Sequence, residues 1–241
     1  MPALDALKKL GVEAKPRKSI GIYGPSMVGK SILAAMIASE WVGVNGAVVV
    51  FGSEEHYADE DYKSLIESLI KARVKYVNYC PTVQDVFKYM SIVHHRKFEG
   101  RLALILDSLS FIAMREQSKY VAMGYTEPRT YLPRVIPVLY SIASNFKRLL
   151  IEKEALGIVI MHAASTAGTK FRGLTVYRPS MAMRVAHSLD YLILMNSEGP
   201  GLEAPRVLTL IASRLNPLLE GSTVKVKFRG DTVELVEGGT K

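Results

Sequence analysis

The stretch Gly24-Pro25-Ser26-Met27-Val28-Gly29-Lys30-Ser31 decides the fold of this 241-residue chain. It matches the pattern G-x-x-x-x-G-K-[ST], and it stands between an apolar run that ends at Tyr23 and a helical pattern that begins near Gly29. In such a loop the backbone N–H groups converge on phosphate oxygens, while the lysine reaches the β- and γ-phosphates and the serine hydroxyl ligates Mg²⁺. The stretch therefore predicts a nucleotide site with Mg²⁺, and a fortuitous glycine turn is the alternative.

The pattern on both sides of this loop alternates between short apolar runs and amphipathic segments. Such alternation, followed by a strand-rich C-terminus, predicts an α/β fold: a mostly parallel twisted sheet flanked by helices, with a C-terminal antiparallel extension. The predicted strands are Ser19–Tyr23, Ala47–Phe51, Lys75–Tyr79, Leu102–Leu106, Ile158–Met161, Tyr191–Met195, Val207–Ile211, Val224–Phe228 and Thr232–Val236. The predicted helices are Lys30–Val42, Asp59–Ala72, Val83–Arg96 and Arg129–Glu154.

Two stretches, Phe111–Pro128 and Ala163–Ser180, fit neither pattern and are predicted as long loops. Both follow predicted core strands, which puts them at the carboxyl edge of the sheet, where ligands bind in open α/β folds. The first eighteen residues contain five Lys or Arg and are predicted as a basic arm or short helix outside the sheet. The remaining residues, 19–241, are predicted to form one domain.

The run Leu102-Ala103-Leu104-Ile105-Leu106 ends at Asp107, an acidic residue directly after a buried strand. Such an aspartate emerges at the carboxyl edge beside the phosphate loop, where it holds Mg²⁺ directly or through water. Many buried strands also end in Asp simply as a turn residue. Paired with the phosphate loop, the arrangement favours the metal role for Asp107.

Two adjacent carboxylates, Glu54 and Glu55, follow the predicted strand Ala47–Phe51. If that strand lies near the phosphate loop, one of them is placed to activate the water that attacks the γ-phosphate. The alternative is a pair of acidic residues that favour the start of the next helix through its dipole. The sequence does not distinguish which of the two glutamates faces the nucleotide.

Composition excludes several protein classes. Hydrophobic residues make up 49% and charged residues 22%, which is ordinary for a folded protein, and the one cysteine, Cys80, excludes an internal disulfide framework. No run of about 18 apolar residues predicts a membrane span, and the first residues lack the apolar core of a signal peptide. No His, Cys and Asp cluster has the spacing of a structural zinc site. The expected location is the cytoplasm, with no membrane partner.

The net charge of +8 is concentrated in one third of the chain. Residues 112–184 hold eleven Lys or Arg and four Asp or Glu, and they contain most of both predicted loops. Basic side chains neutralise nucleic-acid phosphates, and interleaved aromatic rings stack on unpaired bases. The alternative is an ordinary solvated basic surface with locally packed aromatics.

In this order, the motifs resemble those of the RecA/RadA superfamily of ATPases, particularly core-only archaeal RadA paralogues and KaiC-like proteins. Ser53-Glu54-Glu55 is similar to the double glutamate of KaiC-like members, and Ile105-Leu106-Asp107-Ser108-Leu109 to the family's apolar run before Asp-Ser-Leu. The segment from Pro179 to Ser188 resembles the recombinases' segment that ends in Ala-His-Ser. The resemblance covers residues 19 to about 236 and implies a RecA-like P-loop core.

The resemblance also implies roles for particular residues. Glu54 or Glu55 is expected to activate water, and Lys30 to assist catalysis. His162 is expected to sense the γ-phosphate, with a hydrogen-bonded core histidine as the alternative. Arg214 is implied as an arginine offered in trans to a neighbouring subunit, with a surface salt bridge as the alternative. The family's two DNA-facing loops correspond to residues 112–128 and 165–184, whose candidate DNA contacts are Arg115, Lys119, Lys170, Phe171, Arg172, Tyr177, Arg178 and Arg184.

Departures from the family pattern refine the expected function. The chain carries neither the N-terminal helical DNA-binding domain of RadA nor the C-terminal one of RecA, and His162-Ala163 stands where recombinases place an Asn-Gln sensor. We therefore expect a Mg²⁺-dependent ATPase that binds single- or double-stranded DNA with weak sequence preference. Its expected role is to modulate recombinational repair beside a full-length recombinase, and its expected assembly is a ring or filament. The alternatives are a KaiC-like regulatory ATPase acting on proteins without DNA, and a nucleotide-binding module with little hydrolysis.

Overall fold

The computed structural model describes residues 2–163, 169–171, 174–176, 185, 188–201 and 203–236, and of the two three-residue segments only the backbone. Its main feature is a sheet that has nine strands in the described part of the chain, in the order β11-β10-β9-β8-β1-β5-β4-β2-β3. The six strands from β8 to β3 are parallel, and β9, β10 and β11 continue the sheet in antiparallel fashion. The predicted mixed sheet with a C-terminal antiparallel extension is therefore confirmed.

The observed strands match the predicted ones or extend them by one or two residues at an end. The strands are β1 (Ser19–Gly24), β2 (Ala47–Gly52), β3 (Val74–Tyr79), β4 (Leu102–Asp107), β5 (Leu156–His162), β8 (Tyr191–Ser197), β9 (Arg206–Ser213), β10 (Thr223–Arg229) and β11 (Thr232–Val236). The helices are α1 (Pro2–Lys9), α2 (Lys30–Val42), α3 (Glu60–Leu69), α4 (Val83–His95), α5 (Leu109–Ala122) and α6 (Pro128–Glu152), with short 3₁₀ turns at Glu55–Ala58 and Pro217–Leu219. In contrast to the strands, α3, α4 and α6 end one to three residues before the predicted helix ends.

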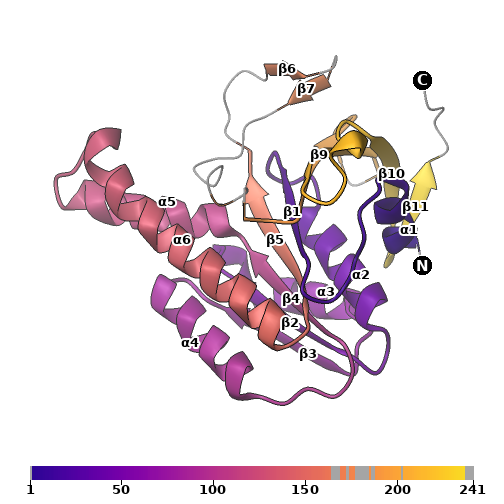
Figure 1. Ribbon diagram of the computed structural model, residues 1–241, viewed down its shortest axis with the longest axis horizontal. Helices are drawn as coiled ribbons and strands as arrows, with labels where there is room; N and C mark the ends of the chain where they lie inside the picture. The colour runs from indigo at the N-terminus through magenta and orange to yellow at the C-terminus, as the bar shows by residue number, and fades with distance from the viewer. Residues whose placement is uncertain are drawn as a thin grey trace.

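Helices cover both faces of the sheet and make two separate apolar layers (Figure 1). Alternate residues of each central strand face opposite sides, so that Val48 and Val50 of β2 belong to the apolar layer that includes α1, α2 and α3, while Val49 and Phe51 belong to the layer that includes α4, α5 and α6. Strands that are buried on both faces read as continuous apolar runs, which is why they could be predicted from the sequence.

The N-terminal segment is part of the core. Its helix, α1, packs against α2 and the edge strand β11, with Ala3, Ala6 and Leu7 fully buried (Figure 1). The carboxylate of Glu40 on α2 accepts hydrogen bonds from the first backbone N–H groups of α1, at 3.2 Å from Ala3 and 3.0 Å from Leu4. The predicted short helix is present, but this packing makes it an integral part of the fold and not a free basic arm.

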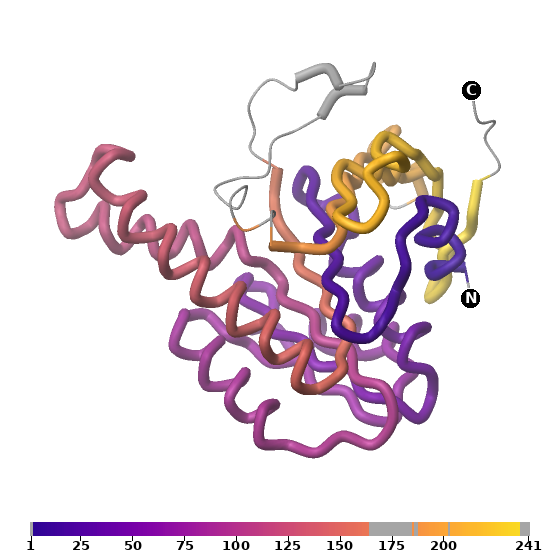
Figure 2. The backbone as a smooth tube through the Cα atoms, viewed as in Figure 1, coloured from indigo at the N-terminus to yellow at the C-terminus, as the bar shows by residue number. Residues whose placement is uncertain are grey.

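The predicted loop Phe111–Pro128 was wrong, because most of it forms α5. Ser108 caps this helix by accepting a hydrogen bond from the Phe111 N–H at 3.3 Å, and the buried Leu109, Ile112 and Ala113 recur at helical spacing. Only residues 123–127 remain as a turn before α6. The ends of α5 and α6 at this turn project beyond the sheet, at the left of Figure 2.

The second predicted loop contains two short strands, β6 (Thr169–Phe171) and β7 (Leu174–Val176), which pair with each other in antiparallel fashion. The side chains of Lys170 and Phe171, and all of Arg172, Tyr177, Arg178 and Arg184, lie outside the described residues.

Candidate nucleotide site

The phosphate loop begins where β1 ends and leads directly into α2, as the sequence predicts. Gly24 leaves no room for a side chain, because a Cβ there would lie 2.1 Å from the backbone oxygen of Met195 on β8. Gly29 has a φ of 90°, a conformation that glycine adopts without strain. Met27 also has a positive φ and is 95% exposed at the tip of the loop. The two motif glycines are therefore required by the neighbouring strand and by the backbone conformation.

Lys30 begins α2 and turns its ammonium back onto the loop. Its Nζ donates to the carbonyl oxygens of Gly24 at 3.2 Å and Pro25 at 2.6 Å. Burial lowers the pKa of Lys30 to about 8, while the charges of Asp107 and Glu54 oppose this shift. A cation held on loop carbonyls at the N-terminus of a helix suits the binding of an anion such as a phosphate.

Asp107 ends β4 and is fully buried, with the hydroxyl of Ser31 close to its carboxylate. Its Oδ2 accepts a hydrogen bond from the hydroxyl of Tyr57 at 2.5 Å, whereas no described residue is a hydrogen-bond partner of its Oδ1. Burial raises the pKa of Asp107, and the nearby charge of Glu54 raises it further. A buried carboxylate oxygen without a partner, next to a serine hydroxyl, fits the oxygen ligands that Mg²⁺ prefers.

The two glutamates after β2 point in different directions. Glu54 faces inward, where its Oε1 lies 2.7 Å from Nε2 of His162 and its Oε2 lies 3.6 Å from Nδ1 of His56. Burial raises the pKa of Glu54, but hydrogen bonds from His162 and Ser108 outweigh this and hold it below its usual value. Glu55 is 80% exposed at its side chain and lies 3.6 Å from the guanidinium of Arg115. The geometry therefore separates a largely buried, ionised carboxylate from an exposed one.

His162 connects Glu54 with the phosphate loop. It ends β5, which pairs with β1 so that His162 is opposite Gly24. Its Nδ1 lies 3.2 Å from the hydroxyl of Ser26, while its Nε2 contacts Glu54. The backbone N–H of Ala163 also donates to the carbonyl of Gly24 at 2.9 Å. The residue that the resemblance implies as a sensor thus lies between the loop and the buried glutamate.

Tyr57 and Arg206 are two residues at this edge that sequence reasoning missed. Tyr57 lies in the 3₁₀ turn after β2, and its ring occupies the space that a Cβ on Gly52 would fill. Arg206 begins β9 and donates from Nε to the carbonyl of Val28 in the phosphate loop at 2.8 Å. A tyrosine in a turn and an arginine at a strand start carry no local signal of these contacts.

Three other candidates lie away from the nucleotide loop. Arg115 and Lys119 lie on α5 and not in a loop: Arg115 donates to the carbonyl of Pro81 at 2.5 Å, and Lys119 pairs with Glu116 at 3.0 Å. Arg214 follows β9 at the amino edge of the sheet, and within the described residues it has no ion pair. The alternative of an intramolecular surface salt bridge for Arg214 is therefore absent from this part of the structure.

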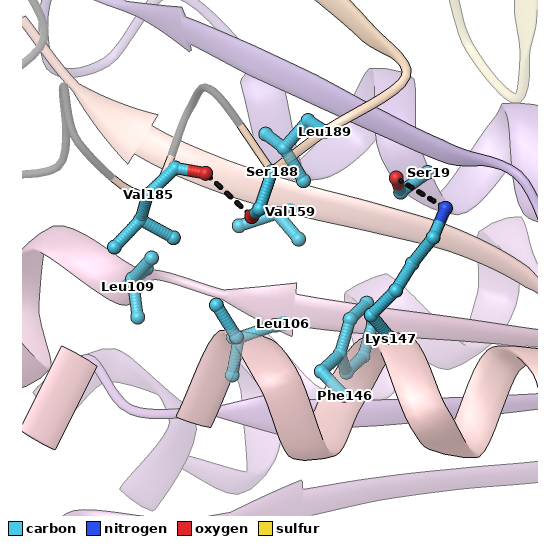
Figure 3. Close-up of a pocket in the computed structure, with 10 residues that line it drawn as sticks. Ser19, Leu106, Leu109, Phe146, Lys147, Val159, Val185, Ser188 and Leu189 are labelled. Atoms are coloured by element: carbon cyan, nitrogen blue, oxygen red, sulfur yellow. Dashed lines mark hydrogen bonds between the residues drawn. The ribbon is translucent and has the colours of Figure 1, made fainter. Parts of the chain in front are cut away.

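A small cavity lies between α6 and the sheet, away from the phosphate loop (Figure 3). Its volume of about 10 Å³ leaves room for one water molecule at most, and apolar side chains dominate its wall. The cavity is a packing defect of the core and not a ligand site. The residues around it are Ser19, Leu106, Leu109, Ala143, Phe146, Lys147, Val159, Val185, Ser188 and Leu189.

Two features are absent from the described part of the chain. No group of three or more His, Cys, Asp or Glu side chains there is arranged to hold a metal ion. No helix among the same residues combines the length and the apolar character needed to cross a membrane.

Comparisons with known proteins support the architecture. Neither the models of known protein families nor the curated proteins include a match to this chain. Among solved structures, the crystal structure of the RadB recombinase is similar, with a TM-score of 0.60, 16% sequence identity, and coverage of 96% of each chain. At this level of identity the match concerns the fold alone. The chain therefore has a RecA-like α/β fold, with a mostly parallel sheet between helices and antiparallel strands at its C-terminal side.

Proposed function

We propose that the protein binds Mg²⁺ and ATP at the phosphate loop and hydrolyses the γ-phosphate. The observation that supports this most strongly is the convergence of Lys30, Ser31, Glu54 and Asp107, from three places in the sequence, at one edge of the sheet. The fold likeness to a recombinase adds support, because P-loop sites occur at this edge of α/β sheets.

In this proposal Ser31 and Asp107 hold the Mg²⁺ ion. The unpartnered Oδ1 of Asp107 and the adjacent serine hydroxyl are the oxygen donors that fit it. When bound, Mg²⁺ supplies positive charge that neutralises phosphate oxygens. Tyr57 keeps the other oxygen of Asp107 engaged and so fixes the orientation of the carboxylate.

Glu54 is the proposed base that orients and activates the attacking water. It is largely buried and ionised, and it contacts His162 beside the phosphate loop, whereas Glu55 is exposed and contacts Arg115. His162 contacts Glu54 and Ser26 together, so that it is placed to register a change at either of them. We therefore assign the water-activating role to Glu54 and the sensor role to His162.

The test is steady-state ATP hydrolysis together with Mg-ADP binding in three variants. Lys30→Ala is expected to abolish both binding and turnover. Glu54→Gln is expected to lower turnover by about 100-fold or more while Mg-ADP binding is retained. Glu55→Gln is the matched control and should stay within about twofold of wild type, since this side chain is exposed. Unchanged turnover in Lys30→Ala would show that the assigned site is wrong.

We further propose that the protein binds DNA and acts as an accessory of recombinational repair. The excess of basic residues in 112–184 supports this, as does the likeness in fold to a recombinase. The helices on either side of the α5–α6 turn add exposed basic side chains, Lys119 on α5 and Arg129 on α6. Association with a full-length recombinase, or with further copies of this chain in a ring or filament, belongs to the same proposal.

A salt series with labelled single- and double-stranded DNA tests DNA binding. The affinity should fall as the salt concentration rises, because each neutralised phosphate releases counterions. The double variant Arg172→Ala/Arg178→Ala should weaken binding and flatten the salt slope. The control variant Lys97→Ala removes an exposed charge from the opposite edge of the sheet and should change neither. Absence of binding at low salt would refute this part of the proposal.

A further inference from the structure

Arg206 is a charged side chain buried in the hairpin of β8 and β9, with only 1% of its surface exposed. Its hydrogen-bond partners are neutral oxygens. NH1 donates to the hydroxyl of Ser197 at 2.8 Å and to the carbonyl of Ala204 at 2.5 Å, and NH2 donates to the carbonyl of Gly201 at 2.7 Å. Three of its bonds thus stay within the hairpin.

The fourth bond leaves the hairpin and reaches the phosphate loop. Nε of Arg206 donates to the backbone oxygen of Val28 at 2.8 Å, across 178 residues of sequence. No carboxylate in the described part of the chain pairs with Arg206, so that its buried charge is stabilised by carbonyl dipoles. A charge-assisted bond of this kind is among the stronger ones that a loop carbonyl can receive.

The bond fixes the orientation of one peptide plane. In a planar trans peptide the C=O and the following N–H point in opposite directions. Because Arg206 holds the C=O of Val28 toward the hairpin, the N–H of Gly29 points away from the hairpin. The ring of Phe228 on β10 packs directly against Gly29, since a Cβ on Gly29 would lie 2.7 Å from this ring. Backbone N–H groups at this position of such loops bind phosphate oxygens.

We propose that Arg206 is a positioning residue for nucleotide binding, which holds the Val28–Gly29 peptide in the orientation that donates to phosphate. The inference rests on the proposed ATP site. It makes the phosphate loop depend on the C-terminal hairpin, so that the sequence motif alone does not define the binding site. Arg206 itself touches no reacting atom.

The experiment compares Arg206→Lys and Arg206→Gln with Ser197→Ala, which removes a hairpin bond of Arg206 but leaves its bond to Val28 in place. We expect both Arg206 variants to weaken Mg-ADP binding by about tenfold, the value of one charge-assisted hydrogen bond. The KM for ATP should rise by a similar factor with kcat nearly unchanged. Ser197→Ala should lower thermal stability but retain wild-type affinity.

Backbone NMR supplies a readout that a merely structural role would not change. In the wild type the amide proton of Gly29 should shift downfield when Mg-ADP is added, and in Arg206→Lys this shift should be reduced. Equal affinity and an equal Gly29 shift in wild type and Arg206→Lys would overturn the inference while leaving the proposed function intact. Failure of the wild type to bind Mg-ADP would overturn both. If Arg206→Gln does not fold, Arg206→Lys alone decides.

Discussion

At the scale of single residues, the buried ammonium of Lys30 makes nucleotide binding depend on pH. Its pKa of about 8 means that the free protein loses this charge in mildly alkaline solution, while a bound phosphate favours the charged form. Above about pH 8, binding must take up a proton, so that the affinity for Mg-ADP should fall by about tenfold per pH unit. Calorimetric titrations from about pH 7 to about pH 9.5 measure this slope.

The stability of the free protein should change in the opposite direction. The pKa of Lys30 is about 8 in the folded state and 10.5 as its ordinary value, so that the unfolded chain binds more protons between them and this group favours folding as the pH rises. Lys30→Arg keeps the charge at alkaline pH and should flatten the affinity profile. An equal loss of affinity with pH in Lys30→Arg and wild type would assign the effect to another group.

At the scale of elements, the contact between α6 and β5 depends on a glycine. A Cβ on Gly157 would lie 2.4 Å from Cδ1 of Leu150 and 2.9 Å from the ring of Phe146. Gly157→Ala should therefore lower the free energy of unfolding by about 1–3 kcal/mol through overpacking. In Gly199→Ala the nearest heavy atom is the Cβ of Ala204 at 3.5 Å, and this control should stay within about 0.5 kcal/mol. Denaturant unfolding measures both, and equal values would show that the α6–β5 contact is able to relax.

The strands and helices differ in how well local sequence patterns predicted them. The central strands β1, β2 and β4 were predictable because burial on both faces leaves continuous apolar runs. The helix α5 was missed although Ser108 is a good N-cap and Leu109, Ile112 and Ala113 follow helical spacing, so that its signal was present in the sequence.

The candidate site, like the fold, contains residues that local sequence patterns predict and contacts that they do not. Lys30, Ser31 and Asp107 belong to motifs whose neighbours in sequence define them, and the sequence therefore predicted them. The contacts of Tyr57 with Asp107 and of Arg206 with Val28 span 50 and 178 residues. They arise from the order of strands in the sheet, which no local pattern records.

At the scale of the whole molecule, α1 extends the core beyond the domain boundary that was predicted at residue 19. Leu7 is 1% exposed among residues of α2 and the sheet. Leu7→Ala should destabilise the protein by about 2–5 kcal/mol, because it leaves a cavity. Leu218→Ala is the control, since this side chain is 93% exposed and its loss should change stability by less than about 0.5 kcal/mol. Thermal unfolding compares the two variants. Unchanged stability in Leu7→Ala would indicate that residues 1–18 form a segment separate from the core.

The position of β1 between β5 and β8 has a consequence for protein synthesis. β1 is made first among the strands, yet its two neighbours are residues 156–162 and 191–197. Chains emerge from the ribosome N-terminus first, so that the strand before the phosphate loop waits for most of the chain to be translated before it is paired on either side. A nascent chain arrested before β8 has been extruded would carry the complete motif and still lack the surroundings that shape it.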